Sequence, residues 1–367
     1  MKILSSLLLL SLPFISHAQF GKPELIARYA GTTHWNAPVS IYCFFSEPAV
    51  DRETIYLGCL ENEDYLMVKW DESGYSEVAR AQPGHRFSFP VSFSGGVSWY
   101  EYDELTSTRS FVANENDLKV DDIKKLGPVG SFQPLGENTW LYHLKKSVPE
   151  LWIMNPSSTR PVFTQNVAYI FSPVVGHNGE AVTKVRKDSM SNSAPDELWT
   201  LKKGEWRKVL EDTDSNPSSP WVSFRHQLAI EGDRILIFAQ DKKAEALIIY
   251  ENGRVAEIAR AGVHLKSFDH FSAKMKSGVV AFRGVDLKGN KAVWAYYKGK
   301  LSRLITQGDM VLTDKGYGRV HYKNEHSIFY GAPGISQNGD VVLQATLTDP
   351  DYPETLIGVG ILKFTQE

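Results

Sequence analysis

The chain has 367 residues and a formal net charge of −3. This balance, with no run of basic residues, argues against a nucleic-acid-binding protein. Aromatic residues make up 12 % of the chain, with 9 Trp, and helical periodicity is scarce, so the composition is typical of an all-β protein.

The first predicted element is an export signal. Residues 1–18 carry an early Lys2, an apolar run and a Ser-His-Ala exit, the pattern of a cleaved secretory signal peptide. The run is too short to span a membrane, and no later stretch is apolar enough to do so. We therefore expect residues 19–367 to be exported to a periplasm or beyond the cell, without a transmembrane segment and as a monomer.

Two cysteines follow, Cys43 and Cys59, sixteen positions apart. In an oxidising compartment, cysteines on neighbouring strands can form a disulfide. The alternative is a pair of buried thiols facing the core. Because the sequence does not fix their geometry, both alternatives stay open.

From here a unit of four strands recurs about every 40–60 residues, with Gly, Asn or Pro turns between strands. Its first strand combines small and aromatic residues, as in SFRHQL (223–228) and SFDHFSA (267–273). Versions of its second strand are TIYLGCL (54–60), GGVSWYEY (95–102), NTWLYHL (138–144), GEAVTKV (179–185), DRILIFA (233–239), GVVAFRG (278–284) and GDVVLQA (339–345).

The phase of the repeat predicts how the fold closes. The last third strand, ETLIGVGILKF (354–364), has no fourth strand after it, whereas ELIARYA (24–30) precedes the first unit and matches the fourth strands SEVARAQPG (76–84) and AEIARAGVH (256–264). Joining residues 24–30 to the last unit would close a ring and leave no open edge. The sequence therefore predicts a seven-bladed β-propeller, formed by residues 19–367 as one domain.

The chain resembles secreted bacterial propellers whose blades carry a degenerate Asn-Gly-x-Val-x-Phe turn and strand. Asn338-Gly339-Asp340-Val341 and Asn178-Gly179-Glu180-Ala181 match that pattern best, and Ser277-Gly278-Val279-Val280 matches it in part. The resemblance implies the fold and export but no particular activity. The Asn-Gly pairs themselves have a conformational explanation, because tight hairpins need φ > 0.

Histidines gather on one predicted face. Ten are present, and of the nine after the signal peptide all but His143 and His177 lie on first strands or in the loops before them. In a propeller these segments surround one mouth of the central channel. The longest such loop is about 308–326, and long loops are more often functional.

Cations and aromatic residues accompany the histidines. The candidate ligand-binding residues on this face are Arg225, Arg319, Lys266, Asp269, Trp221, Tyr322, His321, His326 and Arg86. Arginine and lysine would neutralise an anionic ligand, and tryptophan and tyrosine would stack on it. We expect a binding module for an acidic glycan or for an envelope or extracellular protein. The simpler alternative is that these residues only populate polar loops.

Two other functions stay open. A polysaccharide lyase acting on uronic-acid glycans would need His226 or His270 as base, Tyr330 as acid and Arg225 or Arg319 as carboxylate neutraliser, all brought together. A structural scaffold of an envelope complex would need no site at all. We expect no cofactor and no metal, because the five-residue spacing of His321 and His326 points them to opposite faces of a strand.

Overall fold

The structure is a computed structural model that describes residues 20–367 except 32, 44–45, 94–95, 104–108, 114–115, 119–128, 137–138, 145–146, 156, 192–193 and 323–325. The predicted signal peptide lies outside the described residues. Within the described part the regular structure consists of strands, and no helix there could cross a membrane.

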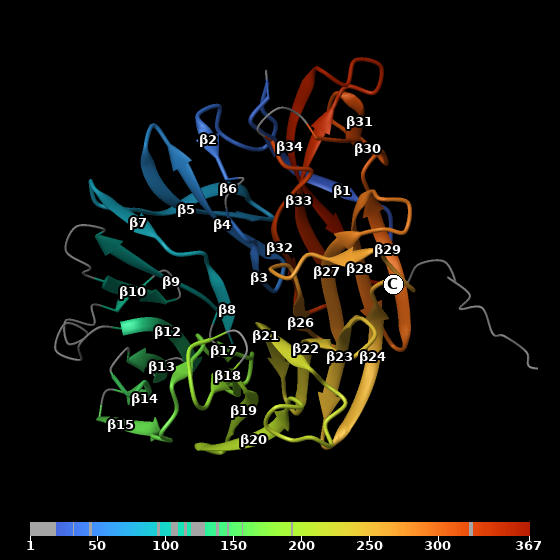
Figure 1. The fold of residues 1–367 in the computed structure, drawn as a ribbon. Coiled ribbons are helices and arrows are strands. Elements are labelled where there is room, and N and C mark those ends of the chain that lie inside the picture. Colours follow the sequence, from blue (N-terminus) through green and yellow to red (C-terminus); the bar gives the residue numbers. More distant parts are fainter. Residues whose placement is uncertain are drawn as a thin grey trace, which may run out of the picture.

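Seven antiparallel sheets form a ring, the blades of a propeller (Figure 1). Blade 1 contains β2 (Ile41–Tyr42), β3 (Ala49–Asp51), β4 (Thr54–Glu61), β5 (Asp64–Asp71) and β6 (Gly74–Arg80). Blade 2 contains β7 (His85–Phe87), β8 (Val91–Phe93), β9 (Gly96–Asp103), β10 (Arg109–Ala113) and β11 (Asn116–Leu118). Blade 3 contains β12 (Val129–Gly136), β13 (Thr139–Leu144), β14 (Glu150–Asn155) and β15 (Ser158–Phe163).

The next three blades follow in chain order. Blade 4 contains β16 (Tyr169–Ile170), β17 (Val174–Val175), β18 (Ala181–Arg186), β19 (Asp196–Lys202) and β20 (Glu205–Glu211). Blade 5 contains β21 (Ser223–Glu231), β22 (Arg234–Gln240), β23 (Glu245–Glu251) and β24 (Arg254–Arg260). Blade 6 contains β25 (Ser267–Phe268), β26 (Lys274–Lys276), β27 (Val279–Val285), β28 (Lys291–Tyr297) and β29 (Lys300–Thr306).

Blade 7 joins the two ends of the chain. It contains β1 (Glu24–Tyr29), β30 (Met310–Thr313), β31 (Gly316–Val320), β32 (Phe329–Ile335), β33 (Val341–Thr348) and β34 (Leu356–Phe364). Strand β1 pairs with β34 in antiparallel register from Glu24↔Lys363 to Tyr29↔Val359, which confirms the predicted closure. The inner strands contact one another from blade to blade, with β32 reaching β3, so the ring is complete.

One prediction about blade 7 was wrong. The stretch 308–326, interpreted as a long loop, contains the hairpin β30–β31, and β31 pairs with β33 through Arg319↔Thr348 and Val320↔Leu347. The hairpin turns at Asp314-Lys315, and Gly316 follows with a φ of 95°, a conformation that glycine adopts freely. Buried Val311 alternates with exposed Leu312, the pattern of a strand with one face on the core.

The core lies between adjacent blades rather than inside any one of them. One apolar cluster, for example, joins Leu236 and Phe238 of blade 5 to Phe268, Val280 and Phe282 of blade 6. Each sheet therefore buries both faces against its neighbours, which explains why the second strands are almost continuously apolar. The inner strands, in contrast, line the central channel.

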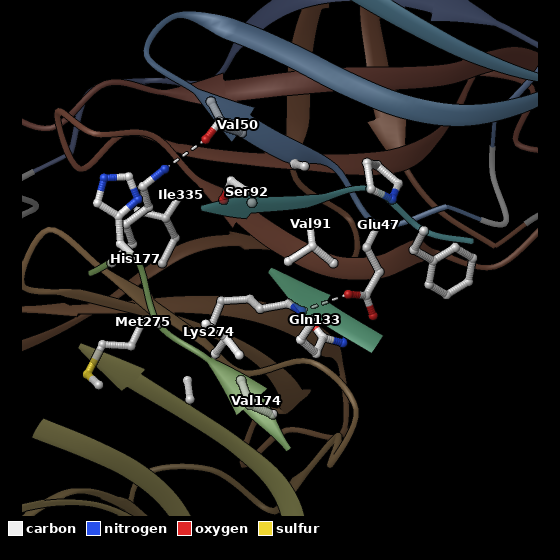
Figure 2. Close-up of a pocket in the computed structure, with 18 of the residues that line it drawn as sticks. Glu47, Val50, Val91, Ser92, Gln133, Val174, His177, Lys274, Met275 and Ile335 are labelled. Atoms are coloured by element: carbon white, nitrogen blue, oxygen red, sulfur yellow. Dashed lines mark hydrogen bonds and ion pairs between the residues drawn. The ribbon is translucent and has the colours of Figure 1, made fainter. Parts of the chain in front are cut away.

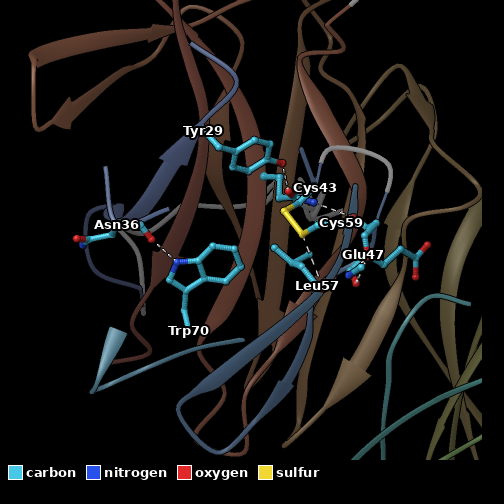
Figure 3. The surroundings of a disulfide bond; sticks show 10 residues. Tyr29, Asn36, Cys43, Glu47, Leu57, Cys59 and Trp70 are labelled. Atoms are coloured by element: carbon cyan, nitrogen blue, oxygen red, sulfur yellow. Dashed lines mark hydrogen bonds between the residues drawn. A yellow bond between two sulfur atoms is a disulfide. The ribbon is translucent and has the colours of Figure 1, made fainter. Parts of the chain in front are cut away.

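Cys43 and Cys59 form a disulfide (Figure 3). Cys43 directly follows β2, whose Tyr42 pairs with Leu60 of β4, so the two cysteines face each other across the first two strands of blade 1. Both are fully buried in an apolar cluster with Ala27 and Tyr29 of β1. The disulfide thus lies in the core where the two ends of the chain close the ring.

Candidate ligand-binding face

The inner strands of blades 4, 5 and 6 are interrupted at the same mouth of the channel. In β21 the pairing register shifts between Phe224 and Leu228, so Arg225 and His226 leave the regular ladder. The same interruption separates β16 from β17 and β25 from β26. Bulges of this kind re-aim side chains. Here they present Arg225 and His226 with exposed surface.

Behind these strands lie two cations held by one carboxylate. Lys184 Nζ lies 3.0 Å from Asp196 Oδ2, and it also donates a hydrogen bond of 2.9 Å to the carbonyl of Phe224. Arg186 Nε donates to the other oxygen, Asp196 Oδ1, at 3.1 Å. All three charged side chains are buried. Burial lowers the pKa of Lys184, and Asp196 opposes that effect.

Glu245 connects the inner strands of blades 5 and 6. Arg225 Nε donates to Glu245 Oε1 at 2.9 Å, and His270 Nε2 lies 2.6 Å from Glu245 Oε2. Burial by itself would raise the pKa of Glu245, but the hydrogen bonds from His270 and Arg225 outweigh it and the pKa is lowered. Glu245 is therefore an ionised anchor that fixes both side chains.

Three rings from three blades lie in series beside these charges. His226 stacks on Phe171 of blade 4, with ring centroids 5.4 Å apart and an interplanar angle of 14°. Its edge meets Phe271 of blade 6 at 5.7 Å. Lys184 Nζ lies 4.3 Å from the centre of the Phe171 ring. Burial, followed by the charge of Lys184 and its cationic neighbours, lowers the pKa of His226.

A cavity of about 650 Å³ opens between blades 6 and 7. Its wall includes His270, Phe271, Arg283, Lys291 and Tyr322. Arg283 is fixed in place, since it donates 2.7 Å to Asp269 Oδ2 and 3.0 Å to the carbonyl of Phe329. The volume falls within the roughly 300–1,000 Å³ of small-molecule sites.

The central channel holds a second cavity, of about 370 Å³, which is lined by inner strands (Figure 2). Its lysines have partners inside the channel. Lys274 Nζ lies 2.8 Å from Glu47 Oε2, and Lys276 Nζ donates 2.8 Å to the carbonyl of Val50. His177 also faces this space (Figure 2). With its cations already engaged, the channel is a weaker candidate than the mouth above it.

The structure brings together only part of the predicted set. Arg225, His226, Asp269 and His270 lie at the interrupted inner strands of blades 5 and 6, whereas Arg319 and Tyr330 belong to blade 7. Tyr330 is buried in the core between blades 7 and 1, and its hydroxyl lies 3.0 Å from His326 Nδ1. The predicted acid for a lyase is thus a buried hydroxyl beside His326.

The other candidates are spread over the face. Arg86 of blade 2 lies 5.4 Å from the ring centre of Tyr65. His321 Nδ1 lies 2.7 Å from the carbonyl of Tyr322, and Lys266 is exposed. Trp221, predicted to stack on a ligand, packs in the core of blades 4 and 5 with 7 % of its surface exposed. Its ring therefore offers little surface to a ligand.

Sequence reasoning missed the charged partners from the second and third strands. Lys184, Arg186, Glu245 and Arg283 were not among the candidates. A signal existed, because Lys184 and Arg283 are charged residues inside strands that otherwise read as apolar. Among the described residues no group of three or more His, Cys, Asp or Glu could hold a metal ion.

The fold and this face define a seven-bladed β-propeller with a cationic, aromatic mouth. No protein-family model and no curated protein matches the chain. A solved prolyl endopeptidase matches 88 % of this chain and 49 % of its own, at 11 % identity and a TM-score of 0.56. A puromycin-hydrolysing peptidase of Mycobacterium tuberculosis matches over 91 % of this chain and 56 % of its own length, at 8 % identity and a TM-score of 0.54.

This chain therefore spans about half the length of these two peptidases. An oligogalacturonate lyase in complex with manganese is similar over 95 % of this chain and 97 % of its own, at 8 % identity and a TM-score of 0.55. At such identities the likeness extends to the fold alone.

Proposed function

We propose that this protein is an exported binding module whose mouth at blades 4 to 7 holds an anionic, carboxylate-bearing ligand, a glycan or a protein. The observation that carries the proposal is an excess of positive charge. The basic side chains around the mouth are Lys184, Arg186, Arg225, Arg283 and Lys291, and the carboxylates that pair with them are Asp196, Glu245 and Asp269.

Arg225 is the cation best placed to meet a ligand. Its side chain is 51 % exposed, and among the hydrogen bonds of the described residues it uses only Nε, for Glu245. Its terminal N–H groups are therefore open to a carboxylate, which a guanidinium can bind in bidentate geometry. Glu245 holds the guanidinium in place, so less rotational freedom is lost on binding.

Export is supported by the pattern of residues 1–18 and by the buried disulfide, since disulfides persist in oxidising compartments. Cell fractionation, with the mature N-terminus read by mass spectrometry, tests it. A chain that stays uncleaved in the cytoplasm would contradict export but would leave the ligand proposal to its own test.

Replacing Arg225 by Ala is expected to weaken binding of polyanionic probes about tenfold or more, because a charge-assisted hydrogen bond is lost. Isothermal titration calorimetry with oligogalacturonate and with polyglutamate measures the effect. Arg207→Ala is the matched control, because Arg207 lies on the outer strand β20 with 70 % of its side chain exposed. Equal losses in both variants would mean that only net charge matters and would overturn the site.

Binding is also expected to strengthen as pH falls. The pKa of His226 is lowered by burial and by Lys184, Arg186, Arg225 and His270, so the free imidazole is neutral near pH 7. A bound anion would raise that pKa, and binding would take up a proton. Affinity should therefore rise as the pH falls from neutral through the lowered pKa of His226. The slope should flatten in His226→Gln; an affinity that falls over this range contradicts the assignment.

The same titrations separate the two other functions considered. A lyase would release unsaturated uronate, which absorbs in the ultraviolet, from the glycan probe. An envelope scaffold would co-purify with another protein and bind neither probe.

A further inference from the structure

We propose that the cavity between blades 6 and 7 is a slot for an acidic sugar, a uronic-acid residue of a glycan. This inference rests on the proposed function, and it selects the glycan over the acidic protein. It assigns the carboxylate to the cations of the slot and the sugar ring to two exposed aromatic side chains, Phe271 and Tyr322.

The charges of the slot suit a single carboxylate. Arg283 is held by Asp269, and His270 is held by Glu245. Lys291 is exposed on the same wall, and none of the ion pairs within the described ranges involves it. An exposed ammonium on the same wall as a fixed guanidinium can neutralise a carboxylate without first breaking an existing pair. The single positive charge of Lys291 matches the single carboxylate that each uronic-acid residue carries.

The walls of the slot suit a sugar ring. Phe271 is 59 % exposed and Tyr322 is 54 % exposed, although both line the cavity. Exposed aromatic rings rimmed by polar groups mark binding surfaces. The apolar C–H face of a pyranose can lie flat against such a ring while its hydroxyls reach polar neighbours. Phe271 is also oriented in advance by its edge contact with His226.

An acidic peptide fits the slot less well. Extended peptides gain affinity by adding a strand to an open sheet edge. The strands that line this cavity are already paired: β25 pairs with β27 through Ser267↔Val285 and Phe268↔Gly284, and β32 pairs with β33 through Phe329↔Ala345. A peptide would therefore bind through its carboxylates alone. A sugar would gain the ring contacts as well.

The test compares two polyanions of equal carboxylate number, oligogalacturonate and polyglutamate, on the mature chain. Calorimetry should show tighter binding of oligogalacturonate. Phe271→Ala and Tyr322→Ala should each weaken its binding about three- to tenfold and leave that of polyglutamate unchanged. Lys291→Ala should weaken both, and Phe271→Tyr should restore sugar binding.

Tyr317→Ala is the control for loss of an exposed aromatic ring. Tyr317 is 60 % exposed on β31 and lies outside the cavity wall. Melting temperatures should be unchanged, because all three rings are exposed. If neither polyanion binds, the proposed function itself fails. If polyglutamate binds as tightly as the sugar, or if Phe271→Ala and Tyr322→Ala have no effect on the sugar, only the slot is overturned.

Discussion

Replacing Asp196 by Asn is expected to lower the free energy of unfolding by about 3–5 kcal/mol, the cost of leaving a buried charge without its partner. Asp196 is 3 % exposed and holds Lys184 at 3.0 Å and Arg186 at 3.1 Å. Both cations stay buried when the carboxylate is lost. The amide of Asn keeps one acceptor oxygen in place of two and brings no counter-charge.

The loss should shrink at high pH, which distinguishes a charge effect from simple misfolding. Burial already lowers the pKa of Lys184, and without Asp196 the neutral amine is favoured further. The folded state then releases a proton that the unfolded state keeps, so stability rises with pH between the two pKa values. Urea unfolding near pH 7 and near pH 9.5 measures this difference, since an ordinary Lys titrates at about 10.4.

Asp188→Asn makes the same chemical change at an exposed carboxylate just beyond β18, and it should change stability by less than about 0.5 kcal/mol. A loss of under about 1 kcal/mol in Asp196→Asn at neutral pH would show that water reaches the two cations. The three charges of Asp196, Lys184 and Arg186 would then contribute little to the stability of the mouth. Binding of the polyanions by this variant reports whether Lys184 still supports Phe171 and His226.

The propeller could be predicted because the same pattern of strands and turns recurs in every blade. Most positions of the second strands are apolar on both faces, and most tight turns carry Gly or Asn, so a weak signal in one blade is strengthened by the others. The closure followed from phase alone, and β1 pairs with β34 as expected. The hairpin β30–β31 was missed because it occurs in one blade only, where no repeat could support it.

The candidate site was found only in part, for a geometric reason. Its histidines lie on inner strands and could be recognised by position, but their partners come from neighbouring strands. Lys184, Arg283 and Gln344 each donate to a carbonyl on the innermost segment of the next blade, at 2.9, 3.0 and 2.8 Å. These carbonyls belong to Phe224 in β21, Phe329 in β32 and Ser46 between β2 and β3. These second-strand polar residues join blades, and Arg283 also lines the cavity between blades 6 and 7. Their role depends on contacts between blades, and the sequence of a single strand does not reveal which residues of the next blade it meets.

Removing the carboxylate of Asp314 is expected to lower the free energy of unfolding by about 1.5–3 kcal/mol, this time at the ring closure, because the pair is only partly buried. Arg28 of β1 is fully buried, and it donates from Nε at 2.8 Å and from Nη2 at 2.6 Å to the two oxygens of Asp314. The Arg28 guanidinium holds the pKa of Asp314 below its usual range. The pair is therefore intact at neutral pH, and its contribution is lost only as pH falls through that lowered pKa.

Asp314 lies in the turn of the hairpin β30–β31, so the ion pair joins the first strand of the chain to the insertion in blade 7. In Asp314→Ala the guanidinium of Arg28 loses its counter-charge. Adding Arg28→Met should recover part of the lost stability, because a buried apolar chain replaces the unpaired cation. The recovery is incomplete because the carbonyls of Thr33 and Ile357 lose the Arg28 donor. Lys315→Ala, the neighbouring exposed position, should be near neutral. Unfolding in urea measures the stability of the unsubstituted protein, the two single variants and the double variant.

If the double variant is no more stable than Asp314→Ala, the pair acts through its geometry rather than its charge. Binding adds a second readout. Strand β31 leads directly into His321 and Tyr322, so loosening the hairpin should also weaken uronate binding at the slot. Polyglutamate binding, which depends on the cations of blades 4 to 6, should stay unchanged. The hairpin would then serve both to secure the closure of the ring and to hold one wall of the slot.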